Sequence, residues 1–88
     1  MTTRVTDTIL YDKCETVNHL LGFEGEGPHD FFLKDGCVCL DTNIGGTQVV
    51  QYVGDHGGTR DLSTRGTKRE CLIYLNGLIK GLDMARKR

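Results

Sequence analysis

The sequence predicts a small α+β domain, in which an antiparallel meander of three or four strands carries an N-terminal and a C-terminal helix on one face. Three observations predict it. Apolar residues recur at helical spacing near both ends of the chain, short segments rich in β-branched and aromatic residues lie between them, and glycine-rich turns separate those segments. The 88 residues are expected to form one domain, 1–88, frayed at 1–4 and 87–88.

The first helix is expected over residues 5–21. Its apolar side chains recur at the spacing of a single buried helix face, namely Leu10, Cys14, Val17 and Leu21. Thr6 or Asp7 is a suitable N-cap, and Gly22 is a suitable residue to follow the helix end. Residues 24–30 contain two glycines and the only proline of the chain, so they are expected to form a loop.

A β-hairpin is expected next, because Asp35-Gly36 is typical of a two-residue type I′ turn. This turn would join strands over residues 31–34 and 37–40. The face that we expect to be covered by the helices carries Phe31, Leu33, Val38 and Leu40. The other face carries Phe32, Lys34, Cys37 and Cys39.

A third strand is expected over residues 47–53, after a turn over residues 41–46. Its apolar residues fall on both faces, with Val50 and Tyr52 on one and Val49 and Val53 on the other. A strand with this pattern is typical of a sheet that is covered on both sides. Residues 54–58 are expected to form a flexible loop, and residues 59–62 a short edge strand.

The C-terminal helix is expected over residues 68–85. Thr67 and Glu70 have the spacing of a capping box, in which each side chain satisfies the backbone N–H group of the other residue. Apolar residues then recur at positions 71, 72, 75, 78, 79 and 82, which is the pattern of a helix with one buried face.

Gly77 and Gly81 interrupt this helix and lie on one side of it, beside Tyr74. Glycine in a helix interior costs about 1 kcal/mol relative to alanine, so the pair calls for a reason. Two interpretations remain open. Another element of the same chain packs closely against the glycines, or Tyr74, Gly77 and Gly81 form an interface with a second subunit.

A basic segment precedes the C-terminal helix. It combines glycines and hydroxyl groups with four cations next to a helix start, where free N–H groups favour anions. The candidate anion ligands are Arg60, Arg65, Thr67, Lys68 and Arg69. The order of residues in a Walker A loop is missing, and the alternative is that these side chains are caps and solvated turn formers.

No catalytic arrangement is visible in the sequence, so we expect a protein that is not an enzyme and uses no cofactor. The four cysteines lack the paired spacing of a zinc site, and no metal is expected. Residues 1–15 have no apolar segment of the kind found in signal peptides, so the cytoplasm and reduced thiols are expected. The net charge of −1 favours neither a nucleic-acid nor a membrane partner.

The chain resembles small accessory proteins encoded by tailed bacteriophages or prophages. The resemblance is carried by residues 18–22, 60–63, 66–70, 74–78 and 81–82, about a quarter of the chain. It implies a protein that binds or inhibits a host protein, or one that forms small oligomers. It implies no catalytic residue.

The leading hypothesis is therefore a non-enzymatic phage or mobile-element accessory protein that binds a host protein in the cytoplasm of the host cell. The first alternative is a module that binds a small anionic ligand or nucleotide through the basic segment. The second alternative is a structural subunit whose self-association is its function.

Overall fold

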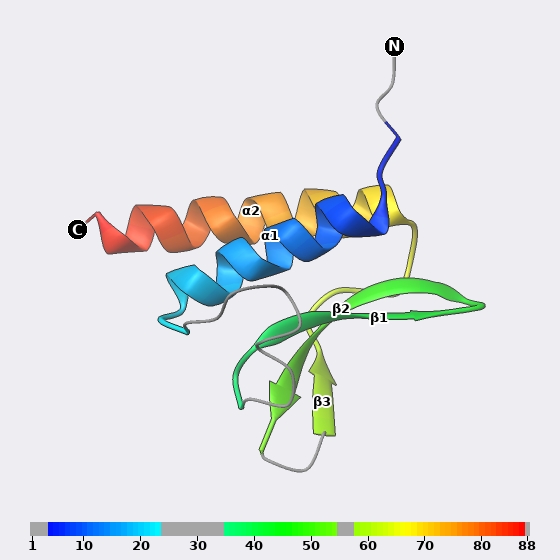
Figure 1. The fold of residues 1–88 in the computed structure, drawn as a ribbon, viewed down its shortest axis with the longest axis horizontal. Coiled ribbons are helices and arrows are strands. Elements are labelled where there is room, and N and C mark those ends of the chain that lie inside the picture. The colour runs from blue at the N-terminus through cyan, green and yellow to red at the C-terminus, as the bar shows by residue number, and fades with distance from the viewer. Residues whose placement is uncertain (1–3, 24–34, 55–57, 88) are drawn as a thin grey trace.

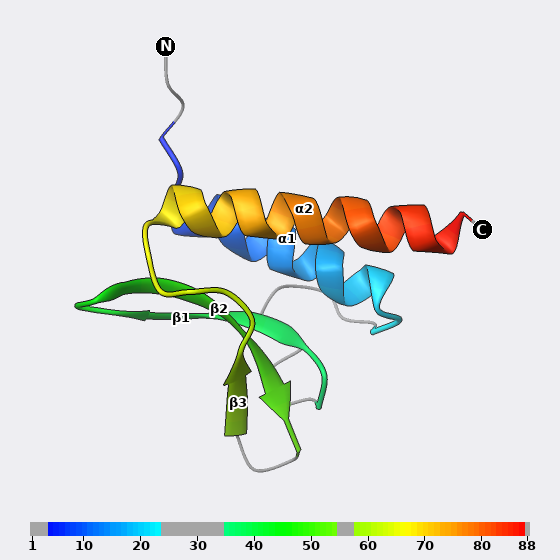
Figure 2. The same ribbon diagram turned by 180° about the vertical axis from the view of Figure 1, so that it is seen from behind.

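The computed structural model describes residues 4–23, 35–54 and 58–87. Its elements are α1 (Asp7–Leu20), β1 (Val38–Asn43), β2 (Gly46–Val53), β3 (Gly58–Asp61) and α2 (Lys68–Arg86). Both helices lie side by side over one face of an antiparallel sheet, whose strand order is β1-β2-β3 (Figure 1). The view from behind shows the same two layers (Figure 2). The predicted α+β fold is confirmed, with three strands among the described residues.

Helix α1 begins and ends at capping structures. The Thr6 hydroxyl accepts a hydrogen bond from the Ile9 N–H group at 3.3 Å, so the helix starts at Asp7 rather than at residue 5. At the other end Gly22 has a φ of 97°, and the Phe23 N–H group donates to the Asn18 carbonyl at 2.9 Å. This is the Schellman arrangement, in which a left-handed glycine closes the helix.

Strands β1 and β2 form a hairpin that differs from the predicted one. Residues 41–43, which were expected in a turn, belong to β1, and only Ile44 and Gly45 connect the two strands. The Asn43 side-chain oxygen accepts from the Gly45 N–H group at 2.7 Å, which fixes the tight turn. The prediction was wrong here because residues 41–43 are polar and exposed, and so show no apolar alternation.

Asp35 and Gly36 turn the chain into the start of the sheet. The Gly36 N–H group donates to the Tyr52 carbonyl at 2.8 Å, while the Tyr52 N–H group donates to the Cys37 carbonyl at 2.9 Å. Two residues therefore oppose one, which is a β-bulge, and the Gly36 φ of 90° suits the glycine position of such a bulge. The predicted partner strand over residues 31–34 lies outside the described residues.

The core lies between the helices and the sheet. Its buried residues are Leu10, Cys14 and Val17 of α1, Val38 of β1, Val49 of β2, and Cys71 and Leu75 of α2. Leu40 packs against this cluster, as the predicted helix-facing side of β1 requires. On the other side of the sheet Cys37 and Tyr52 are buried together, with Cys39 beside them. Strand β2 is thus apolar on both faces, as predicted.

The segment between β3 and α2 stays attached to β2. The edge strand predicted over residues 59–62 is β3, shifted by one residue. After it, Thr47 and Gly66 exchange two backbone hydrogen bonds of 2.8 and 2.9 Å, and the Ser63 hydroxyl accepts from the Val49 N–H group. These bonds fix the point at which α2 leaves the sheet.

Neither helix in the described part of the chain combines the length and the apolar content needed to span a lipid bilayer.

Candidate functional site: the outer face of helix α2

The start of α2 is closed by its own capping box, as the sequence predicted. The Thr67 hydroxyl accepts from the Glu70 N–H group at 3.1 Å, and the Glu70 carboxylate accepts from the Thr67 N–H group at 3.2 Å. Glu70 therefore places a negative charge where an anion would have to bind. Thr67, one of the five predicted anion ligands, is used in this cap.

Arg65 is a structural residue that holds the end of the β1–β2 hairpin. Its guanidinium group donates to the carbonyl groups of Asp41 and Gly46, at 3.2 and 2.9 Å. It also pairs with the Asp41 carboxylate and donates to the Gln48 side chain at 3.1 Å. These bonds use the fork of donors that a free phosphate would otherwise occupy.

The remaining predicted anion ligands lie in separate places. Lys68 forms an ion pair with Asp7 of α1 at 3.1 Å, and the Arg60 Nε group donates to the Gln51 side chain at 3.0 Å. Arg60 lines a cavity of about 290 Å³ that none of the other four residues reaches. Arg69 lies exposed in the first turn of α2. The structure therefore does not gather the five residues around one ligand position.

Helix α2 instead presents an uncovered apolar face on the side away from its buried residues. Ile73 and Met84 are 66% and 63% exposed. A Cβ atom added at Gly77 or Gly81 would meet no described atom within 4 Å. Among the described residues, no other element therefore packs against these glycines, contrary to the first interpretation. Tyr74 is half-buried and packs against the core at the edge of this face.

A cavity adjoins the N-terminal half of this face. It has a volume of about 390 Å³ and is lined by Leu62, Ser63 and Thr64 of the connecting segment and by Glu70, Ile73 and Tyr74 of α2. Ile73 and Tyr74 belong both to the cavity and to the exposed face. The apolar surface of α2 therefore continues into a hollow beside the sheet.

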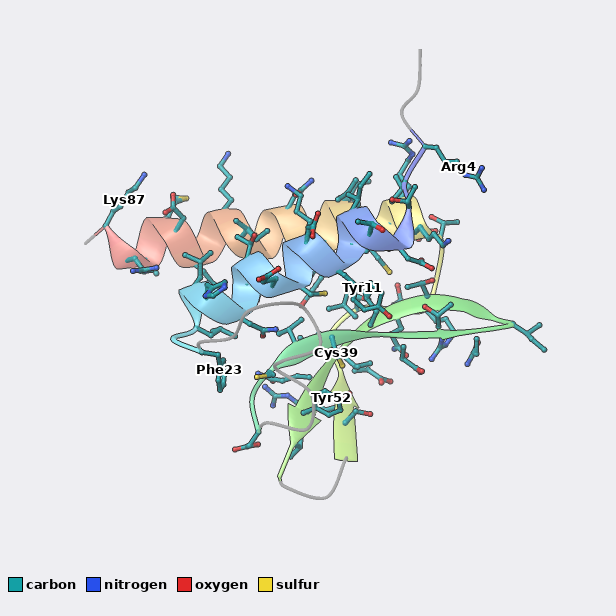
Figure 3. All side chains as sticks on the ribbon, in the orientation of Figure 1. Arg4, Tyr11, Phe23, Cys39, Tyr52 and Lys87 are labelled. Carbon is teal, nitrogen blue, oxygen red and sulfur yellow. The ribbon has the colours of Figure 1, made fainter. Side chains whose placement is uncertain are left out.

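Three of the four cysteines are buried, and Cys39 is half-buried. Burial raises the pKa of Cys14 to about 12 and also raises the pKa of Cys39 and of Cys71. Tyr52 forms a side-chain hydrogen bond with Cys39, and burial raises the Tyr52 pKa to about 12. Figure 3 shows Cys39 and Tyr52 close together on the sheet. Within the described ranges no cluster of three potential metal ligands occurs.

Sequence reasoning found Tyr74, Gly77 and Gly81 but missed Ile73, Met84 and the cavity. Ile73 and Met84 lie off the regular apolar stripe of α2, which was the available signal. The cavity depends on how residues 62–64 return along β2, and no pattern in the sequence specifies that path. Comparisons with protein-family models, curated proteins and solved structures gave no match.

Proposed function

We propose that this protein is a non-enzymatic binding protein that contacts a partner protein through the outer face of α2. We define this face by Ile73, Tyr74, Gly77, Gly81 and Met84. The observation that carries the proposal is the exposure of two large apolar side chains beside two glycines that no described part of the fold covers. The biological setting that fits is an accessory protein of a phage or mobile element that binds or inhibits a host protein.

The energetics of the face support a docking role. Single exposed apolar side chains are common, but apolar side chains grouped along one helix face and beside a cavity are typical of interaction sites. Each glycine also costs about 1 kcal/mol relative to alanine in a helix interior. No described contact within the chain compensates for that cost, whereas a closely approaching partner would do so.

The state of the cysteines supports a role without nucleophilic chemistry. A reactive cysteine requires a lowered pKa, because the thiolate is the nucleophile. Cys14, Cys39 and Cys71 have raised pKa values instead, chiefly because they are buried. These thiols therefore remain protonated at neutral pH and serve the packing of the fold.

Site-specific photo-crosslinking in cells that naturally express the protein tests the proposal. A photoreactive amino acid at position 84 is expected to capture a partner protein, and the additional change Ile73→Asp should abolish that product. The same photoreactive group at position 59, on the exposed strand β3, is the matched control and should capture nothing.

Equal capture from positions 84 and 59 would contradict the proposal. A rise in melting temperature on addition of inorganic phosphate, lost on the change Arg60→Ala, would favour the anion-binding alternative instead.

A further inference from the structure

We infer that the occupant of the outer face of α2 is an acidic amphipathic helix of a partner protein, which places one bulky apolar side chain in the adjoining cavity. This inference rests on the proposed function, because it names the class of partner that the same face would bind. Three properties of the face lead to it, namely its charge, its shape and the position of the cavity.

The charge of α2 favours an acidic partner. Residues 68–87 carry five cationic and two acidic side chains, but Lys68 and Arg86 lie about 140° from Ile73, away from the face. On a helix with 100° per residue, Arg69, Lys80 and Lys87 all lie within about 40° of Ile73, on the side opposite the glycines. Lys80 forms no ion pair among the described residues, whereas Lys87 pairs with Asp83 at 3.2 Å. The apolar face is thus bordered by a basic edge.

The same charge argues against a second copy of α2 as the occupant. Two identical helices packed antiparallel through this face would place their basic edges next to each other, and like charges across an interface are unfavourable. Glutamate or aspartate side chains beside the apolar face of a partner helix would meet Arg69, Lys80 and Lys87.

The shape of the face favours a helix over an extended segment. Gly77 and Gly81 are one turn apart and leave a trough, which Ile73 borders at one end and Met84 at the other, about 16 Å away. The lack of side chains in this trough allows the backbone or a ridge of another helix to approach closely. The cavity beside Ile73 and Tyr74 then lies where an anchoring side chain of that helix would enter.

Two synthetic peptides test the inference with the full chain. Both are 18-residue amphipathic helices with the same leucine and phenylalanine face; the polar face of one carries glutamate and that of the other lysine. We expect the glutamate peptide to bind at least about tenfold more tightly in fluorescence anisotropy, and the difference to shrink in about 0.5 M salt. In NMR spectra of the isotope-labelled protein, the chemical-shift changes caused by the glutamate peptide should centre on residues 73–84.

Variants on the exposed surface sharpen the test. Ile73→Asp should abolish binding of the glutamate peptide, Lys80→Glu should weaken it several-fold, and Thr59→Asp on β3 should leave it unchanged. All three side chains are exposed, so the variants should keep the melting temperature of the parent protein.

Equal affinity for both peptides, or chemical-shift changes centred elsewhere, would overturn the inference. So would a dimer in light scattering that Ile73→Asp dissociates, since the occupant would then be a second copy. If position 84 captures a partner protein but the two peptides bind equally well, the acidic-helix inference would be overturned while the proposed function would stand. Absence of both crosslinking and peptide binding would overturn the proposed function as well.

Discussion

Asn18 shows how a single side chain completes the edge of the sheet. It is 1% exposed on the buried side of α1. Its amide nitrogen donates to the Val38 carbonyl at 3.0 Å, and its amide oxygen accepts from the Val38 N–H group at 2.7 Å. The side chain therefore pairs with β1 as the backbone of a neighbouring strand would, and it joins α1 to the sheet.

Replacing Asn18 by alanine is expected to lower the free energy of unfolding by about 2–4 kcal/mol, because two buried backbone groups of Val38 lose their partner. Urea denaturation measures the change. The matched control is Asn76→Ala, the same substitution at an exposed position of α2, which should change stability by no more than about 0.5 kcal/mol. Similar losses in the two variants would show that the pairing with Val38 contributes little.

Because of Cys14, the free energy of unfolding is expected to depend on pH in the alkaline range. Burial disfavours the thiolate and raises the Cys14 pKa from its ordinary value of 9.0 to about 12 in the fold. The protonated thiol thus stabilises the fold fully below the unfolded pKa, and this contribution is lost as the pH rises from 9.0 towards 12. Urea denaturation should give a lower free energy of unfolding at about pH 10.5 than at about pH 8. The variant Cys14→Ala should show a smaller decrease; an unchanged decrease would rule out this thiol as the cause.

At the scale of elements, α2 carries glycines that its own stability does not require. We expect Gly77→Ala and Gly81→Ala each to raise the free energy of unfolding by about 1 kcal/mol, since open space surrounds both positions. Thermal and urea denaturation measure this gain. If either alanine variant were less stable than the parent, the glycines would have a structural role that the open space does not show.

At Gly46 we expect the opposite effect, a loss of stability, so this position serves as the control for Gly77 and Gly81. Its φ is 123°, and a Cβ atom there would lie 2.6 Å from the Gly66 carbonyl oxygen. Gly46→Ala should therefore destabilise the protein by about 1–3 kcal/mol. The contrast separates glycines that the fold needs from glycines that leave room for a partner.

An element could be predicted from the sequence where it has a regular apolar pattern and recognisable capping residues. Helix α2 was predicted within one residue, because Thr67 and Glu70 mark its start and its apolar stripe is regular. The part of β1 over residues 41–43 was not predicted, because these polar residues have no apolar alternation and pair with β2 through backbone groups and one contact between the Thr42 and Thr47 hydroxyl groups. Backbone pairing of this kind depends on the partner strand and not on local side chains.

For the whole molecule, Arg65 connects the link before α2 to the β1–β2 hairpin, 17 to 24 residues earlier in the sequence. It lies in the link before α2 and bonds to Asp41 of β1 and to Gly46 and Gln48 of β2. Arg65→Ala should lower the free energy of unfolding by about 1.5–3 kcal/mol, as the loss of charged hydrogen bonds predicts. Arg65→Lys should recover only part of it, because an ammonium group cannot form the same fork.

Arg60→Ala is the control for Arg65, because Arg60 is exposed and its only described bond is to Gln51. It should change stability by less than about 0.5 kcal/mol in urea denaturation. Equal effects of Arg60→Ala and Arg65→Ala would contradict the structural role of Arg65. The sequence marked both arginines as anion ligands, because composition alone does not show which groups a guanidinium group contacts in the fold.

The packing of α1 against α2 also determines when the protein can fold during its synthesis. Leu10 and Leu75 meet in one core although they come from opposite parts of the chain. A ribosome adds about 5–20 residues per second, so the apolar stripe of α1 emerges seconds before the helix that covers it. Folding is therefore completed only after α2 has left the ribosome, and a transcript truncated within α2 would yield a chain with an open core, the state that cellular chaperones and proteases recognise.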